Sequence, residues 1–352
     1  MDADIRVMSM TAATRLESRR EAAGFLVSAG FVCLASVRDV YLGGLFQRVS
    51  PPLLAMLAFI LCSAVFLPVG FVSARPSLPV LWEQRRVLFW VNVSTASAWI
   101  AFLYALKLIE PSVVQILYSG IGPLSVIWIE GGILAVGPKI QLTDAERLSL
   151  LALAATLILS SGVVLTGHSG LGHAPIGTAA LGVGLAALGG VSISVSTMLC
   201  RSLNDAGVAP SALLAFRFPM TVVAAAVVIA LSPSGMSPRL SWIDTWVTVG
   251  AVLIIVLNYV NQLAISLASP FTVRAVLAVA PVLIFFLQIA EGRLAASRYS
   301  LTAAILYGFA AIAVAVTRRH AIRPAAVAAA GTGTPSRVIT TIQRTTLADP
   351  EE

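Results

Sequence analysis

The feature that most constrains this chain is a succession of apolar segments, each about as long as a bilayer is thick. A helix needs about 20 apolar residues to cross the hydrocarbon core of a membrane. Ten such segments follow one another with short polar breaks between them: residues 23–46, 52–73, 87–107, 112–136, 148–166, 176–200, 210–232, 243–266, 270–290 and 299–317. The sequence therefore predicts an all-α membrane protein with ten transmembrane helices.

The composition excludes most other classes of protein. Of the 352 residues, 58% are hydrophobic and 11% are charged, whereas a soluble domain carries roughly 25% charged residues. A soluble enzyme, a disordered protein and a disulfide scaffold are therefore excluded. Cys33, Cys62 and Cys200 all lie in apolar segments, where cysteine is usually a small packing residue. We expect no metal site and no cofactor.

The positive charges indicate topology rather than nucleic-acid binding. With a cytoplasmic N-terminus, fifteen of the 23 Lys and Arg residues lie in cytoplasmic tails and loops, and five lie in outer loops. This bias predicts that both termini are cytoplasmic. Residues 1–22 form an N-terminal tail in this scheme. Residues 318–352 lack a periodic apolar face, so we predict a disordered C-terminal tail there.

The chain also contains an internal repeat. Pro51 and Pro210 begin similar apolar segments and are 159 residues apart, and the same offset relates Pro111 to Pro270. We therefore predict two five-helix units, residues 23–166 and 176–317. An odd number of helices inverts the second copy, and inverted repeats are typical of secondary transporters. The alternative is that apolar helices led by proline are alike in composition alone.

These residues resemble the drug/metabolite transporter superfamily, specifically its EamA-like branch. The resemblance covers about residues 23–317 and includes tight turns at Pro111 and Pro270, Pro123 within YSGIGPLSVIWIEGG and Pro281 within LAVAPVLIFFLQIAEG. It implies ten helices around a central cavity, and a substrate among amino acids, other small metabolites, drugs, sugar phosphates or nucleotide sugars. Family members often have an acidic residue about thirteen positions after the proline, whereas Glu130 comes seven after Pro123.

Two arginines within the apolar segments are the first candidates for substrate binding. An arginine at the centre of a membrane helix costs about 2.5–3.5 kcal/mol on insertion scales, so it needs a reason to be there. Arg217 lies about seven residues into segment 210–232, and Arg274 follows Pro270 by four residues. We predict that both bind an anionic group of the substrate. The alternative is that their long side chains extend to the headgroups.

Polar side chains on two further helices are candidates for orienting the substrate. Gln115 and Tyr118 share a helical face on segment 112–136. Asn258, Asn261 and Gln262 lie on one face of segment 243–266. Amides both donate and accept, which suits a polar neutral or zwitterionic ligand. Hydrogen bonds between helices are the alternative role for the three amides.

Two carboxylates and two prolines complete the predicted site. Glu130 is a candidate for proton coupling or for pairing with Arg217, and an interfacial cap is the alternative. Asp39 is a candidate to balance a cation in the cavity. It adjoins Arg38, about 100° away around the helix, so we expect the two not to face one partner. Pro123 and Pro281 are predicted kinks or hinges.

The sequence thus predicts a secondary transporter of the inner (plasma) membrane that exports amino-acid-like or other small metabolites by alternating access. The alternatives are an exchanger of organic anions, sugar phosphates or nucleotide sugars, and an efflux protein for cationic drugs. We expect no enzymatic activity, because no nucleophile–base pair or metal-ligand spacing lies at membrane depth. The expected partners are a small-molecule substrate, the lipid bilayer and, as an open alternative, a second copy of the chain.

Overall fold

The computed structural model describes residues 2–73, 75–128, 142–172, 174–232, 245–267 and 270–331, and all regular structure within them is helical. The helices are α1 (Asp2–Leu45), α2 (Pro51–Ser73), α3 (Ser77–Glu83), α4 (Arg85–Leu108), α5 (Pro111–Trp128), α6 (Asp144–Leu165), α7 (Ile176–Asp205), α8 (Pro210–Phe216), α9 (Pro219–Ala230), α10 (Thr245–Leu267), α11 (Pro270–Leu277), α12 (Ala280–Ala290) and α13 (Arg298–Gly331).

Eight helical stretches are long and apolar enough to cross a membrane: Ala22–Leu45, Pro51–Val72, Arg85–Leu108, Asp144–Leu165, Ile176–Asp205, Pro210–Ala230, Val247–Ala264 and Arg298–Arg318. The two other predicted segments correspond to shorter helices. Segment 112–136 contains α5, and segment 270–290 contains α11 and α12. The chain is therefore a multi-pass α-helical membrane protein, as the spacing of the apolar segments predicts.

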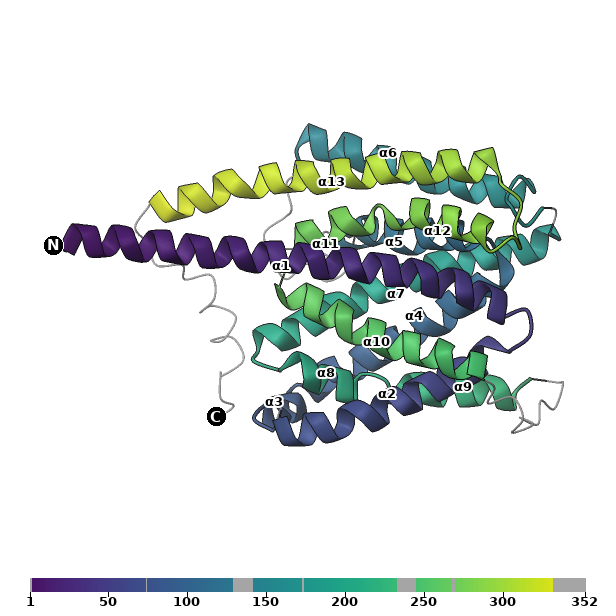
Figure 1. Cartoon of the computed structure of the whole chain (residues 1–352), viewed down its shortest axis with the longest axis horizontal. Coiled ribbons are helices and arrows are strands. Elements are labelled where there is room, and N and C mark those ends of the chain that lie inside the picture. The colour runs from purple at the N-terminus through teal and green to yellow at the C-terminus, as the bar shows by residue number, and fades with distance from the viewer. Residues whose placement is uncertain are drawn as a thin grey trace, which may run out of the picture.

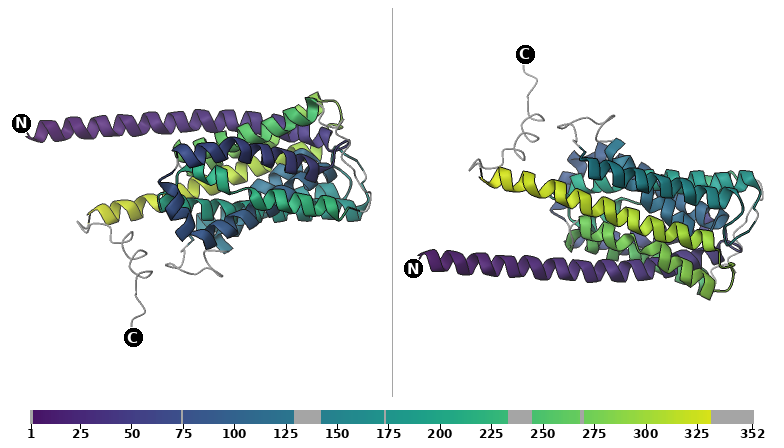
Figure 2. Two further views of the ribbon diagram at one scale, coloured as in Figure 1. Left: turned by 90° about the horizontal axis from the view of Figure 1, so that it is seen from below. Right: turned by 90° about the horizontal axis from the view of Figure 1, so that it is seen from above.

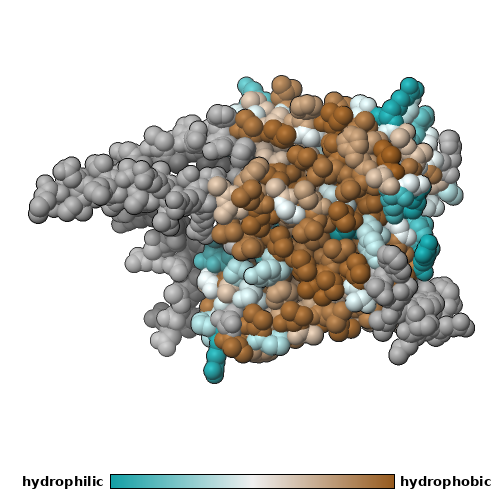
Figure 3. All heavy atoms as spheres, in the orientation of Figure 1, coloured by the Kyte–Doolittle hydropathy of each residue, from teal (hydrophilic) through white to brown (hydrophobic). Residues whose placement is uncertain are grey.

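The long helices lie side by side in one bundle, and α1 begins at the same end of the bundle at which α13 finishes (Figures 1 and 2). The surface matches this arrangement, since a broad apolar belt covers the middle of the visible face, and hydrophilic residues gather towards its ends (Figure 3). Large apolar side chains such as Leu148, Ile158 and Phe309 are about 70% exposed. Exposure on this scale indicates a surface that faces lipid.

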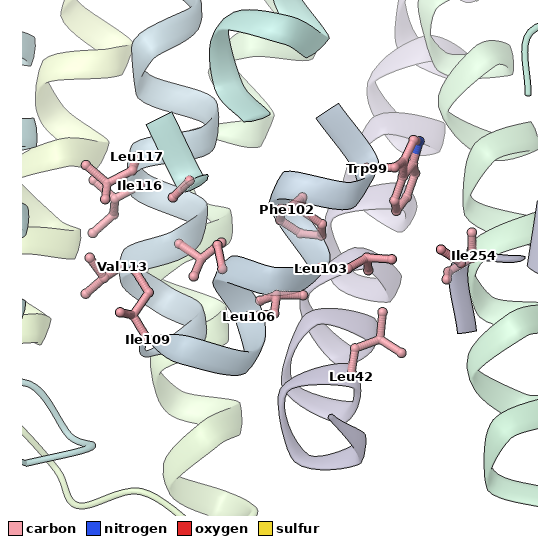
Figure 4. Packing of buried hydrophobic residues seen from close by; sticks show 14 of the residues in the cluster. Leu42, Trp99, Phe102, Leu103, Leu106, Ile109, Val113, Ile116, Leu117 and Ile254 are labelled. Carbon is pink, nitrogen blue, oxygen red and sulfur yellow. The ribbon is translucent and has the colours of Figure 1, made fainter. Parts of the chain in front are cut away.

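The interior is packed with apolar side chains from several helices. Phe102, Leu103 and Leu106 of α4 meet Leu42 of α1 and Val113 of α5, and all five are at most 2% exposed (Figure 4). Lipid tails are as apolar as leucine, so close packing rather than exclusion of water holds such helices together.

The structure interrupts two of the predicted segments, one of them next to Pro281, where a kink or hinge was predicted. Segment 210–232 is divided into α8 and α9, and segment 270–290 into α11 and α12. Each second helix has a proline, Pro219 or Pro281, in its first turn. Proline lacks the N–H that a continuous helix needs and its ring clashes with the preceding turn. Pro123, in contrast, lies inside α5, which continues to Trp128.

Both tails contain helix, which differs from the prediction for the C-terminal tail, of which residues 332–352 lie outside the described residues. Helix α1 begins at Asp2, and α13 continues to Gly331, so residues 318–331 are helical and not disordered. This part of α13 is rich in alanine, which has the highest helix propensity of all residues. An apolar face is therefore not required for it to form a helix.

Candidate functional site

The break between α8 and α9 exposes backbone groups that a continuous helix would have paired. Pro219 has no N–H and its ring clashes with the preceding turn, which prevents the regular bonding pattern there. The side chain of Asn92, on α4, pairs with backbone groups on both sides of the break. Its Nδ2 donates to the carbonyl oxygen of Phe216 at 2.8 Å, and its Oδ1 accepts from the N–H of Met220 at 3.4 Å. Unpaired backbone groups are costly in a membrane. Asn92 therefore allows an interrupted helix at this depth.

Arg217 occupies this break and turns inward. Its residue exposure is 5%. Nε donates to Thr95 Oγ1 on α4 and Nη2 donates to Ser196 Oγ on α7, both at 3.3 Å. Its guanidinium carbon lies 5.5 Å from the ring centre of Phe218. The side chain thus contacts neighbouring helices inside the bundle, rather than extending outward as the headgroup alternative requires.

No carboxylate neutralises Arg217 among the side chains that the structure describes, since none lies within 4.0 Å of it. Its two hydroxyl partners are neutral, and they already bond to each other at 2.7 Å. Both bonds from the guanidinium are longer than the usual 2.9–3.0 Å. Within the described part of the chain, the charge of Arg217 is therefore not compensated, and the guanidinium keeps donor capacity for an anionic group.

Arg38 forms a second buried cationic site, and here the charge is compensated. Its Nη2 lies 2.6 Å from Asp39 Oδ1, and its Nε donates to the same oxygen at 2.8 Å. The guanidinium carbon lies 5.6 Å from the ring centre of Trp99 and 5.5 Å from that of Phe102. The sequence analysis considered only whether the two could share a partner and did not predict this mutual pair, which forms because the flexible arginine side chain bends back to its neighbour.

Asp39 is therefore balanced by Arg38 rather than by Arg217. Its second oxygen, Oδ2, is buried and has no hydrogen-bond partner in the described part of the chain, and the same is true of the indole N–H of Trp99. Buried polar groups are normally paired, so each unpaired one calls for an explanation. An acceptor and a donor thus remain free beside the Arg38 ion pair.

Aromatic rings connect the two arginines. Phe59 stacks on Phe218 with ring centres 4.7 Å apart and meets Trp99 at 5.1 Å. Phe102 continues the series to Tyr118 at 4.6 Å. The hydroxyl of Tyr118 is within electrostatic range of both arginines and of Asp39. Phe59 and Phe218 were not predicted as site residues, because an apolar ring in an apolar segment carries no sequence signal.

Of the other predicted polar residues, Gln115 and Asn258 form hydrogen bonds within their own helices. Gln115 is buried and donates to Ser119 Oγ at 2.8 Å within α5. On α10, Asn258 and Gln262 are buried, whereas Asn261 is half-buried. Asn258 donates to the carbonyl oxygen of Ile254 in its own helix at 2.9 Å.

None of the hydrogen bonds among described residues joins the α10 amides to Arg217. Arg274 belongs to α11, but its side chain lies outside the described part of the structure, and so does the whole of Glu130. Cooperation of these residues with Arg217 therefore stays a prediction.

Comparison with known proteins adds a fold and no function. No family model matches the chain. No curated protein matches it either. A solved structure described as "Crystal structure of protein" is similar to it, with a TM-score of 0.57 and 22% identity over 85% of this chain and 99% of the other. At this identity the likeness shows a shared fold alone.

Proposed function

We propose that this protein is a ten-helix secondary transporter that exports amino-acid-like or other small metabolites, with Arg217 binding an anionic group of the substrate. The observation that carries the proposal is the buried Arg217 at an interrupted helix, whose charge no described carboxylate compensates. Interrupted membrane helices commonly form the substrate sites of secondary transporters. An ionisable residue at membrane depth is by itself a functional candidate.

The surroundings of Arg217 favour a small organic anion with an apolar part. The guanidinium offers donors in a planar fork, which matches a carboxylate or a phosphate. The ring of Phe218 lies beside the guanidinium, and the rings of Phe59 and Trp99 continue from it, so this side offers apolar contact. A zwitterion fits as well, because Asp39 Oδ2 can accept from an ammonium group. Organic anions and sugar phosphates are the second candidate, since Arg217 suits them equally.

Transport would proceed by alternating access between two inverted five-helix repeats, residues 23–166 and 176–317. The common offset of Pro51–Pro210 and Pro111–Pro270 supports these repeats. In this scheme Arg274, Gln115, Tyr118 and the amides of α10 orient the substrate, and Glu130 couples protons. The same proposal places the protein in the inner membrane with both termini in the cytoplasm, and assigns it no enzymatic step.

A ligand screen tests the role of Arg217. Purified protein is heated with amino acids, organic anions, sugar phosphates, nucleotide sugars or cationic drugs, and the melting temperature is recorded. A ligand at about 100 times its Kd stabilises the folded state by about 2.7 kcal/mol. We expect an anion or zwitterion to raise the melting temperature of the wild type and of Arg201→Ala, whose arginine is exposed at the end of α7, but not that of Arg217→Ala.

Two results would contradict this assignment. One is an anionic ligand that stabilises Arg217→Ala as much as it stabilises the wild type. The other is stabilisation by cationic drugs alone that survives the substitution, which favours drug efflux. Arg217→Lys keeps the charge without the planar fork, and we expect it to retain part of the shift.

A further inference from the structure

A second buried charge lies far from Arg217 in the sequence, at the turn between α4 and α5. Glu110 is fully buried, with 0% exposure. The chain becomes extended at Ile109 and begins α5 at Pro111. The carboxylate is thereby directed into the bundle rather than into solvent. A buried carboxylate must be paired or strongly hydrogen-bonded to be tolerated.

Glu110 is held by donors alone. Its Oε1 accepts from Ser112 Oγ at 2.6 Å and from Gln288 Nε2. Its Oε2 accepts from Ser300 Oγ at 2.7 Å and from the backbone N–H of Gly170 at 2.8 Å. No described lysine, arginine or histidine lies within ion-pair distance of it. Four hydrogen-bond partners, and no described cation, thus hold the buried carboxyl group.

The four donors come from separate parts of the chain. Ser112 belongs to the first predicted repeat, and Gly170 to the connection between the repeats. Gln288 of α12 and Ser300 of α13 belong to the second repeat. One carboxylate therefore joins both repeats and their connection at one end of the bundle.

The backbone at Gly170 is shaped for this junction. Its carbonyl oxygen accepts from the N–H of Ala295 at 3.2 Å. A Cβ atom at position 170 would lie 2.6 Å from the carbonyl oxygen of Ala295, so a larger residue would force the two segments apart. A glycine at this position allows the N–H of residue 170 to reach Glu110.

Other polar contacts at this end lie nearer to the surface. Ser297 Oγ donates to the carbonyl oxygen of His168, and both residues are outside the core. Arg293 Nε lies 3.4 Å from Glu291 Oε2 within one short loop. Exposed bonds of this kind contribute little, because water competes for the same groups. Glu110 is thus the buried connection.

We propose that Glu110 is the clamp that closes this end of the bundle, and that its bonds to Gln288 and Ser300 break whenever the two repeats separate there. This inference rests on the proposed alternating access. Glu110 is a positioning residue in it and does not touch the substrate. A glutamine at position 110 would keep the shape, lose the charge and direct an NH₂ group at donors, so the clamp would be weakened.

Spin-label distances test the clamp without a known substrate. Lys107 and Ala296 are exposed on opposite sides of the clamp, one in each predicted repeat. Labelled cysteines are placed at both positions in full-length protein in nanodiscs, after the three native cysteines are replaced by alanine. We expect one short distance with Glu110 present. Glu110→Gln is expected to add a longer-distance population, and Glu110→Asp, which keeps the charge, to restore most of the short one.

Matched controls distinguish an opening at Glu110 from a general loss of packing in the helix bundle. A label pair at Arg48 and Thr166, both exposed and both in the first repeat, is expected to keep its distance in every variant. Glu291→Gln removes an exposed carboxylate at the same end and is expected to leave both distances unchanged. If Glu110→Gln keeps the wild-type distance, or if Glu291→Gln lengthens it equally, the clamp is refuted.

A milder variant covers the case in which Glu110→Gln does not fold. Ser300→Ala removes one donor and no charge, and is expected to raise the ratio of long to short distances about tenfold. An unchanged ratio in Ser300→Ala contradicts the clamp. These readouts need no ligand, so their outcome is independent of the ligand screen on Arg217, and each proposal fails by its own measurement.

Discussion

Arg38 and Arg217 are buried to nearly the same degree, with 8% and 5% exposure, yet their charges are handled in opposite ways. Arg38 binds the carboxylate of Asp39 at 2.6 Å, so the pair is neutral as a unit. Arg217 has two hydroxyl partners at 3.3 Å and no carboxylate in the described chain. Burial alone therefore does not distinguish the two arginines. The proposed binding role of Arg217 depends on a charge that no described carboxylate compensates.

The largest expected effect is on stability, at the compensated pair. Arg38→Met leaves Asp39 buried without its cation, and breaking a buried ion pair in this way costs about 3–5 kcal/mol. The double variant Arg38→Met/Asp39→Leu removes both charges and should recover most of that loss. Unfolding in detergent micelles measures both. A double variant as unstable as the single one would show that the pair does more than neutralise itself.

A smaller loss is expected at the break between α8 and α9. Asn92→Leu removes the bonds to the Phe216 carbonyl and the Met220 N–H, which should cost about 1–3 kcal/mol. The matched control is Asn261→Leu, in which the amide is only half-buried. Comparable losses in the two variants, measured as melting temperatures, would argue that the break needs no support from α4.

Replacing Arg217 should change the free energy of unfolding only slightly. Arg217→Met removes a charge that no described carboxylate balances, and Thr95 and Ser196 remain bonded to each other at 2.7 Å. We therefore expect a change within about 1 kcal/mol, because the lost contacts are offset by the relief of burying a charge. A loss as large as that of Arg38→Met, measured in the same micelles, would make Arg217 a structural residue and remove the contrast with Arg38.

The last expected effect, again small, concerns one of the two hydroxyl partners of Arg217. Thr95→Val removes the 3.3 Å bond to Arg217 and the 2.7 Å bond to Ser196, and such bonds between membrane helices average about 0.6 kcal/mol each. Ser97→Ala is the matched control, because Ser97 bonds to Ser192 at 3.0 Å between the same two helices without contacting an arginine. If ligand affinity falls equally in both variants, Thr95 does not position Arg217.

The sequence predicts the apolar helices well, because segment length and hydropathy are local properties that a bilayer constrains strongly. The interruption at Pro219 was also visible in the sequence as a proline inside an apolar segment, although the prediction named Pro123 and Pro281 instead. The pairing of Arg38 with Asp39 was not predicted. The angle of about 100° between neighbouring residues describes only where their side chains leave the helix, and it ignores the length of the arginine side chain.

Glu110 shows where prediction from sequence ends. Ser300, one of its four partners, is 190 residues further along the chain. A carboxylate next to Pro111 has the appearance of an ordinary turn residue. Its role depends on how distant helices pack, which local patterns do not determine.

The most direct test of the central claim is transport itself. Proteoliposomes are loaded with a carboxylate or zwitterion that stabilises the wild type, and uptake of the same labelled compound is followed. If Arg217 binds the substrate, we expect saturable uptake by the wild type and by Arg201→Ala. Arg217→Met should lose most of this uptake although that variant stays folded. Equal uptake by Arg217→Met would contradict the claim that Arg217 binds the substrate.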